Sequence, residues 1–220
     1  MPEKDILISP SFLNADFGHL ADEFKSVKSA DWLHVDVMDG HFVDNATFSP
    51  TIFEQIDKDE VHLPLDIHLM VSDPDTYLEL CERISDKHDI TNITFHGEVA
   101  RDTVVRRRLI ERIHGICSHA GISINPNTPI SDIEDIMTEV DLALLMTVQP
   151  GFGGQEFKSE VLEKIKELRK KVPELMIQVD GGINAETAAQ CREVGANNLV
   201  AGSYVFGNDD REEAIRSLRG

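Results

Sequence analysis

Eight short runs of apolar, largely β-branched residues recur along the chain, and segments with helical spacing separate them. The runs lie at 6–9, 32–37, 63–70, 90–95, 121–125, 142–148, 175–180 and 197–202. A strand followed by a helix, repeated about eight times, is typical of a parallel α/β fold. For 220 residues without a linker-like interruption, this pattern predicts a single (β/α)₈ TIM barrel domain spanning residues 1–220.

Three intervening segments illustrate the helical spacing. The stretch 184–195 begins at Asn184, a good N-cap residue, and stops near Gly195. Two others each carry an apolar helical face, formed by Phe17, Leu20, Phe24 and Val27 in 16–30 and by Val161, Leu162, Ile165, Leu168 and Val172 in 159–172. A doubly wound sheet would favour a G-x-G-x-x-G turn after the first strand, and "ISPSFLNADFG" contains none.

The charge balance limits the partners. The chain has 21 Lys plus Arg against 40 Asp plus Glu, so the formal net charge is −19. This charge repels nucleic acid and anionic membrane surfaces, so we expect neither as a partner. An anionic substrate would have to be bound by local donors. Three scattered cysteines without a C-x-x-C pair predict reduced thiols, and the absence of a signal-like or membrane-length apolar run predicts a cytoplasmic protein.

The strand "WLHVDV" and the residue after it carry polar groups on one face. Side chains alternate along a strand, so Leu33 and Val35 would point outward beneath the helices of a barrel. His34, Asp36 and Met38 would then point inward, near the carboxyl end of the strand. Active sites of this fold lie at that end, so these three side chains are candidates for the site.

Two other strands add similar groups at the same end of the barrel. His68 and Met70 are two residues apart in "LDIHLM", and Asp180 ends "LMIQVD". Two imidazoles and two carboxylates, from His34, Asp36, His68 and Asp180, suit a divalent transition metal. The two aspartates can also exchange protons.

Each of these residues has a plainer interpretation when it is taken alone. A histidine in a strand is more often a hydrogen-bonded core residue than a ligand, and an aspartate at a strand end is often a helix cap. The methionines Met38, Met70 and Met146 are ordinary core filler unless the metal site is present. The coincidence of four ligand types at strand ends favours the metal site.

Glycine-rich segments follow the last three strands, as "QPGFGGQ", "VDGGIN" and "VAGSYVFG". Loops after the seventh and eighth strands, with a short helix, form the usual phosphate site of this barrel class. We therefore expect backbone N–H groups near Gly181, Gly182, Gly202 and Ser203 to contact a phosphate. Tight turns use glycine for geometry alone, which is the alternative for any one pair. "GFGGQ" is longer than a turn requires and predicts a mobile loop over the substrate.

The sequence resembles the ribulose-phosphate 3-epimerase family. The shared motifs occur in order along nearly the whole chain: "ISPSFLNADF", "HVDVMDGHFV", "PLDIHLMV", "NPNTP", "PGFGGQ", "VDGGIN" and "AGSYVFG". Asp44 and Gln149 stand where the family usually has proline and asparagine. The resemblance implies a ribulose-phosphate-binding (β/α)₈ barrel that interconverts D-ribulose 5-phosphate and D-xylulose 5-phosphate. It also implies a homo-oligomer.

The same resemblance assigns roles to residues. It implies one divalent metal, zinc first with iron(II), manganese or cobalt as alternatives, bound by His34, Asp36, His68 and Asp180. Asp36 and Asp180 would be the catalytic acid and base. Substrate contacts would come from Ser9, His68, Gly151, Phe152, Gly153, Gly154, Asp180, Gly181, Gly182, Gly202 and Ser203. We further hypothesise that Met38, Met70 and Met146 form a dry wall around the reaction intermediate.

Two other functions remain open, and the sequence argues against a third. An allulose 6-phosphate 3-epimerase would share the barrel, the metal set and the two aspartates, and would differ in loop detail. Barrel lyases and decarboxylases need a lysine inside the barrel, and none of the eight predicted strands carries one. A non-catalytic sugar-phosphate-binding barrel would need the ligands and glycines but not two aspartates.

Overall fold

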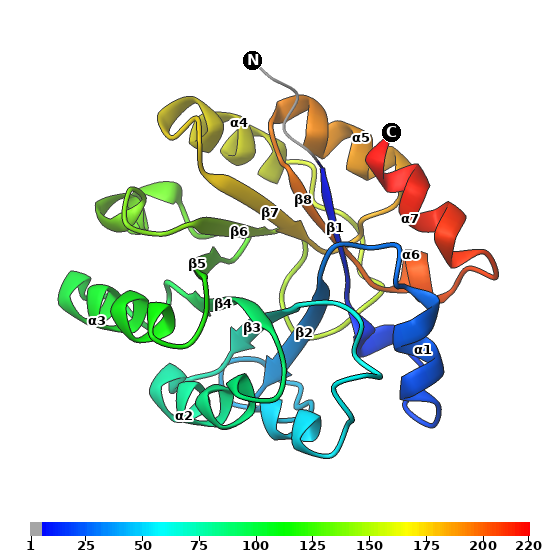
Figure 1. The fold of residues 1–220 in the computed structure, drawn as a ribbon. Helices are drawn as coiled ribbons and strands as arrows, with labels where there is room; N and C mark the ends of the chain where they lie inside the picture. Colours follow the sequence, from blue (N-terminus) through cyan, green and yellow to red (C-terminus); the bar gives the residue numbers. More distant parts are fainter. Residues whose placement is uncertain (1–5) are drawn as a thin grey trace.

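The computed structural model describes residues 6–220 and forms one parallel eight-stranded sheet that curls into a barrel (Figure 1). Its strands are β1 (Leu7–Pro10), β2 (Leu33–Met38), β3 (Leu65–Met70), β4 (Ile90–His96), β5 (His119–Ile124), β6 (Leu142–Met146), β7 (Met176–Asp180) and β8 (Asn198–Ala201). The strand order is β1-β8-β7-β6-β5-β4-β3-β2, and a parallel bridge between Ser11 and His34 joins its two ends. The predicted (β/α)₈ barrel is confirmed, and the strand boundaries differ from the predicted ones by two residues or fewer.

Helices surround the sheet, as the ribbon shows (Figure 1). They are α1 (Leu20–Ser26), α2 (Pro74–Ser85), α3 (Thr103–His114), α4 (Val161–Lys171), α5 (Ala185–Val194), α6 (Ser203–Phe206) and α7 (Arg211–Arg219). The side chain of Asn184 caps α5 by accepting from the N–H groups of Glu186 and Thr187, and Gly195 ends that helix in the left-handed region. Both ends of α5 agree with the sequence prediction.

Two connections depart from the simple repeat. After β2 the chain forms only a short 3₁₀-helix, η2 (Pro50–Glu54), and after β5 it forms η3 (Ile130–Asp132) and η4 (Glu134–Ile136). Prolines at positions 50, 126 and 129 lack the N–H that an α-helix interior needs. A fourth short 3₁₀-helix, η1 (Phe12–Asn14), lies between β1 and α1.

The first helix is shorter than predicted, and the placement of Phe17 on its apolar face is wrong. Residues 16–19 form a turn in which the Asp16 carboxylate accepts from the Gly18 N–H, because this side chain competes with a helical backbone. Helix α1 therefore begins at Leu20, and Phe17 is 47% exposed. Phe24 and Val27 are buried, as expected.

The two faces of each strand belong to different layers of the core. Outward-facing Leu33, Val35 and Val37 pack in the large cluster between sheet and helices. A separate inner cluster fills the barrel with Trp32, Leu142, Leu144, Met146 and Val148. The alternation predicted for β2 is confirmed, and it places His34, Asp36 and Met38 inside the barrel.

Within residues 6–220, no helix is long and apolar enough to cross a membrane. None of the eight described strands carries a lysine.

Candidate active site and metal centre

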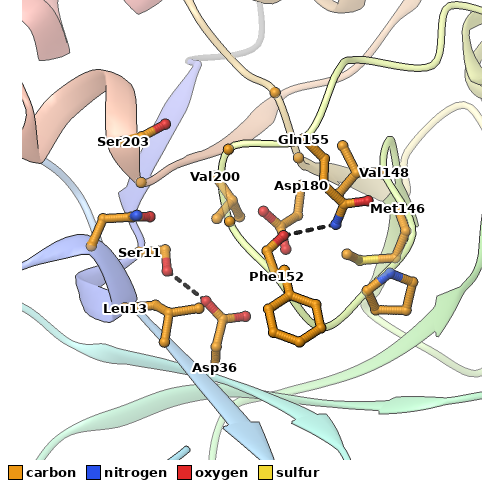
Figure 2. Close-up of a pocket in the computed structure, with 18 of the residues that line it drawn as sticks. Ser11, Leu13, Asp36, Met146, Val148, Phe152, Gln155, Asp180, Val200 and Ser203 are labelled. Atoms are coloured by element: carbon orange, nitrogen blue, oxygen red, sulfur yellow. Dashed lines mark hydrogen bonds between the residues drawn. The ribbon is translucent and has the colours of Figure 1, made fainter. Parts of the chain in front are cut away.

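A cavity opens at the carboxyl ends of the strands (Figure 2). Its lining includes the predicted run Gly151, Phe152, Gly153 and Gly154, the pair Gly181 and Gly182, and Gly202, Ser203, Asp36, Asp180, Met38, Met70 and Met146. Strand ends, the loops that follow them and the first residue of α6 supply these residues. Two of the predicted substrate contacts, Ser9 and His68, are not among the described residues that line the cavity.

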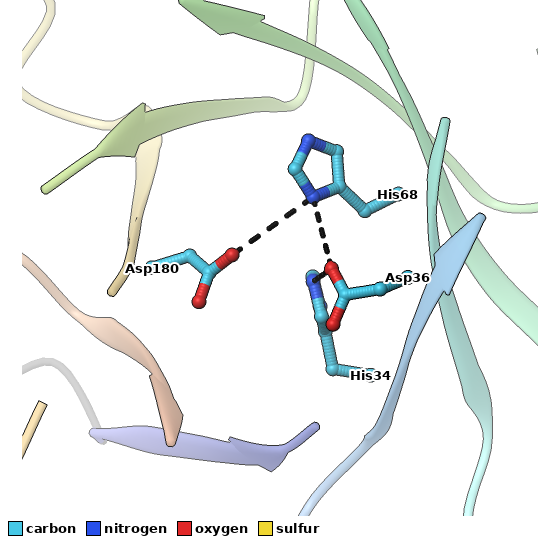
Figure 3. A group of neighbouring side chains, drawn as sticks. All are labelled: His34, Asp36, His68 and Asp180. Atoms are coloured by element: carbon cyan, nitrogen blue, oxygen red, sulfur yellow. Dashed lines mark ion pairs between the residues drawn. The ribbon is translucent and has the colours of Figure 1, made fainter. Parts of the chain in front are cut away.

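His34, Asp36, His68 and Asp180 converge beside this cavity, which Asp36 and Asp180 line (Figure 3). Each offers one ligand atom, and these atoms all lie within 4.8 Å of one another. Asp36 Oδ1 is 3.4 Å from His34 Nε2 and 3.4 Å from His68 Nδ1, and Asp180 Oδ2 is 4.0 Å from His68 Nδ1. Ligand atoms about 2.1 Å from an ion at the corners of a tetrahedron are about 3.4 Å apart, so the spacing fits a divalent cation.

Two buried nitrogen atoms support the same conclusion. Over the described part of the chain, His34 Nε2 and His68 Nδ1 have no hydrogen-bond partner, although both rings are fully buried. Buried polar atoms are nearly always paired, so an orphaned pair facing a carboxylate indicates ligand positions. The residues present therefore fit a metal ion.

The carboxylates of the site perturb one another and the imidazoles. Burial would lower the pKa of His34, but the carboxylates of Asp66 and Asp36 raise it well above its usual range. Burial lowers the pKa of His68 to about 4. Burial, and then the neighbouring Asp36 carboxylate, raises the pKa of Asp180 well above that of an ordinary aspartate. A cation would reduce this repulsion between carboxylates.

A second carboxylate, Asp66, orients the first imidazole. Asp66 Oδ2 lies 2.8 Å from His34 Nδ1 and also accepts from Gln178, and its Oδ1 accepts from Asn92. When a metal ion displaces the proton from Nε2, the proton kept on Nδ1 by Asp66 would leave the lone pair of His34 Nε2 directed at that ion. The sequence interpretation missed Asp66, although its position two residues before His68 places it on the same inward face of β3.

Ser11, not Ser9, contacts the Asp36 carboxylate. The Ser9 hydroxyl is buried and donates to Asn198 Oδ1 at 2.9 Å. Ser11 lines the cavity, and its hydroxyl donates to Asp36 Oδ2 (Figure 2). The structure thus provides no cavity contact for Ser9. Both serines face inward, and sequence spacing does not reveal which of them reaches the mouth.

Glycine geometry shapes the loops of the cavity. Gly181 and Gly182 have φ of +118° and +65°, which side chains rarely adopt. At Gly202 a Cβ would lie 2.1 Å from Asn14 Oδ1, and at Gly182 it would lie 3.0 Å from the backbone nitrogen of Phe157. These glycines therefore have a packing role besides turn geometry. Asn14 and Phe157 lie so close to Gly202 and Gly182 that any side chain at the glycine would displace them.

The loop 149–155 covers part of the cavity and is held by its own polar groups. Gln155 Nε2 donates to the carbonyl oxygens of Gln149 and Phe152, at 2.6 and 2.7 Å. Asn45, in the loop after β2, donates to the Gly151 carbonyl at 2.7 Å. The predicted movement of this loop stays a prediction.

The fold and the site together define a TIM-barrel enzyme with a candidate divalent-metal centre at the barrel mouth. Residues 7–206 match the model of the ribulose-phosphate 3 epimerase family. Ribulose-phosphate 3-epimerase of Bacillus subtilis (strain 168) is 45% identical over 222 residues, which cover 98% of this chain and 99% of that protein. The chloroplastic ribulose-5-phosphate-3-epimerase of Arabidopsis thaliana is 41% identical, over 99% of this chain and 77% of its own length. The chain belongs to the ribulose-phosphate 3-epimerase family.

Solved structures of other barrel enzymes share the fold. A 3-hexulose-6-phosphate synthase is similar with a TM-score of 0.67 at 14% identity, over 97% of this chain and 98% of that one. A mutant tryptophan synthase α-subunit from Pyrococcus furiosus has a TM-score of 0.71 at 14% identity, over 98% and 97% of the two chains. At these identities the similarity concerns the fold alone.

Proposed function

We propose that the chain interconverts D-ribulose 5-phosphate and D-xylulose 5-phosphate, with Asp36 and Asp180 as the acid and base. The observation that carries this proposal is the pair of carboxylates, from non-adjacent strands β2 and β7, that line one cavity in a full-length relative of epimerases. Epimerisation removes the proton on carbon 3, next to the ketone, and returns a proton to the opposite face. Two carboxylates that reach the substrate from different sides can serve both faces.

The electrostatics support different protonation states for the two aspartates, with Asp36 ionised and Asp180 protonated. Burial would raise the pKa of Asp36, but the imidazoles of His34 and His68 lower it below its usual range, and Ser11 donates to its carboxylate. The raised pKa of Asp180 favours its holding a proton. One carboxylate can therefore accept the carbon 3 proton while the other donates, and the roles reverse in the opposite direction.

The proposed ligands are His34, Asp36, His68 and Asp180. When bound there, a divalent cation supplies fixed positive charge beside the enediolate that forms between the two proton transfers. Two nitrogen and two oxygen ligands suit zinc best, while iron(II), manganese and cobalt are compatible with the same set.

We assign the phosphate to the backbone around Gly181, Gly182, Gly202 and Ser203. These residues line the cavity, and the loops they occupy follow β7 and β8. Among the described residues that line the cavity there is no lysine or arginine. Recognition by backbone N–H groups therefore accounts for an anionic substrate in a chain with a net charge of −19.

Met38, Met70 and Met146 line the same cavity and are nearly fully buried. Polarizable thioethers without hydrogen-bonding groups would keep water from the enediolate, which supports the proposed dry wall. Replacing each with leucine should lower turnover by more than about twofold. Turnover unchanged by all three replacements would make them core filler.

Deuterium exchange tests the reaction. We expect purified protein incubated with ribulose 5-phosphate in deuterated water to place deuterium at carbon 3 and to form xylulose 5-phosphate, as followed by NMR. A chelator should abolish both, and added zinc should restore them. No exchange by the zinc-loaded protein would refute the pentulose assignment, and allulose 6-phosphate would be the next substrate.

Homo-oligomer formation and a cytoplasmic location stay predictions.

A further inference from the structure

The second candidate imidazole ligand, His68, is supported by another histidine. His68 Nε2 lies 2.9 Å from His96 Nε2, and the two rings are stacked with centroids 5.0 Å apart. Both side chains are fully buried. The ring of Phe42 lies 4.5 Å from that of His96, and His96 is not among the described residues lining the cavity. His96 therefore reaches the site only through His68.

One proton arrangement is compatible with a metal on His68. A ligating nitrogen must present its lone pair, so His68 Nδ1 carries no proton and Nε2 does. The hydrogen bond between the two rings then needs an acceptor on His96 Nε2. His96 must accordingly carry its proton on Nδ1.

Glu98 contacts the other ring nitrogen of His96, Nδ1, and stabilises a proton there. Its Oε2 lies 3.1 Å from His96 Nδ1. Its Oε1 accepts from the Asn125 N–H at 2.7 Å and from the Thr128 hydroxyl at 2.6 Å. Burial would raise the pKa of Glu98, but the hydrogen bond from His96 and the donors on Oε1 hold it below its usual range, so the group is a carboxylate. Both of its oxygen atoms therefore act as acceptors.

We infer that His96 and Glu98 are positioning residues that fix the tautomer of His68 and so set the metal affinity of the site. The inference rests on the proposed metal site. Along the chain of contacts, the Glu98 carboxylate holds a proton on His96 Nδ1. The free Nε2 of His96 holds a proton on His68 Nε2, and His68 Nδ1 is left to bind the ion.

Glu98→Gln reverses this order without changing the shape of the side chain. The Asn125 N–H cannot rotate away, so the amide oxygen of glutamine must occupy the Oε1 position and the NH₂ group must face His96. His96 then accepts on Nδ1 and donates from Nε2. His68 becomes the acceptor, and its own proton moves to Nδ1, where the ion should bind.

The matched control is Thr128→Val. It removes a donor to the same carboxylate of Glu98 but leaves the contact between Glu98 and His96. We expect the zinc dissociation constant of Thr128→Val to stay within about twofold of the unsubstituted protein, and that of Glu98→Gln to rise about 10–100-fold. Competition with a chromophoric chelator measures both constants.

Long-range ¹H–¹⁵N spectra of the zinc-loaded, unsubstituted protein provide a second readout that does not depend on how any variant folds. We expect His96 protonated on Nδ1 and His68 protonated on Nε2. A proton on His96 Nε2 would overturn the inference, as would a Glu98→Gln protein that is folded and binds zinc as tightly as Thr128→Val.

These outcomes are separable from failure of the proposed function. Unsubstituted protein that binds zinc with the expected tautomers but exchanges no deuterium at carbon 3 would refute the epimerase and leave the positioning role intact. Protein that binds no zinc would overturn the positioning role, and deuterium exchange at carbon 3 would still decide the epimerase.

Discussion

Gly181→Ala should destabilise the barrel much more than the same change at Gly154. Both glycines have positive φ, +118° at Gly181 and +73° at Gly154, so alanine strains the backbone at either position. Among the described residues, no heavy atom lies within 4 Å of a Cβ built at Gly154. At Gly181 the new Cβ would lie 2.4 Å from Val148 Cγ2 and 2.7 Å from its Cγ1.

Val148 cannot easily move out of the way. It is buried and belongs to the inner core cluster beside Met146. Rotation about χ1 would move both γ carbons, but Val148 Cβ itself would remain 2.9 Å from the new methyl group. The backbone after β7 would therefore have to shift, and Asp180 would shift with it.

The expected cost follows from these contacts. Left-handed strain costs about 1–2 kcal/mol at either glycine. Overpacking against Val148 adds about 1–3 kcal/mol at Gly181 only. We expect the free energy of unfolding to fall by about 1–2 kcal/mol in Gly154→Ala and by about 2–5 kcal/mol in Gly181→Ala.

Urea unfolding followed by circular dichroism measures both changes, provided that the slopes agree. Losses equal to within about 0.5 kcal/mol would refute the steric argument, because strain alone would then explain both variants. The double variant Gly181→Ala with Val148→Ala offers a further check. It should be less destabilised than the sum of its single changes, since removing both γ carbons relieves the closest contacts.

Three further predictions concern activity. Asp180→Asn should lower turnover by about 10²–10⁴-fold while substrate still binds, whereas a non-catalytic barrel would bind substrate without turnover both before and after the change; kcat and a binding titration decide. Ser11→Ala removes the hydrogen bond to Asp36 and should lower kcat, while Ser9→Ala should lower the melting temperature and leave kcat unchanged; the opposite pattern would restore the Ser9 assignment. Gln155→Ala frees two carbonyl oxygens of its loop and should raise KM about tenfold with a smaller change in kcat, and an unchanged KM would show that the loop does not depend on these bonds.

Much of the site could be predicted because strand periodicity is a local property. Side chains two apart in a strand share a face, so His34, Asp36 and Met38 could be placed together before any contact was known. The same rule applied to His68 and Asp180 brought four ligands to one end of the barrel. Asp66 and His96 occupy positions of the same kind, and applying the rule to every strand would have found them.

Other contacts depend on how the strands are staggered. Ser9 and Ser11 obey the same periodicity, but strands of a barrel tilt and shift relative to one another. Ser9 pairs with Val200 and its hydroxyl donates to Asn198, whereas Ser11, which bridges to His34, donates to Asp36. A resemblance between sequences does not show which of two serines, two residues apart, reaches the cavity.

The sequence by itself determined the class of fold, the inward face of the strands that carry the candidate ligands, the candidate metal-ligand set and the family. These follow from the repeat of strand and helix, from side-chain alternation and from motif order, which are all properties of short segments. Only the tertiary structure decided which serine reaches the cavity and which partners orient the imidazoles. Glu98 meets His96 beyond the end of β4, and its other oxygen is held by Asn125 and Thr128 from the loop after β5. The contacts of Glu98 with Asn125 and Thr128 join segments about thirty residues apart, and they form only once β4 and β5 have paired in register.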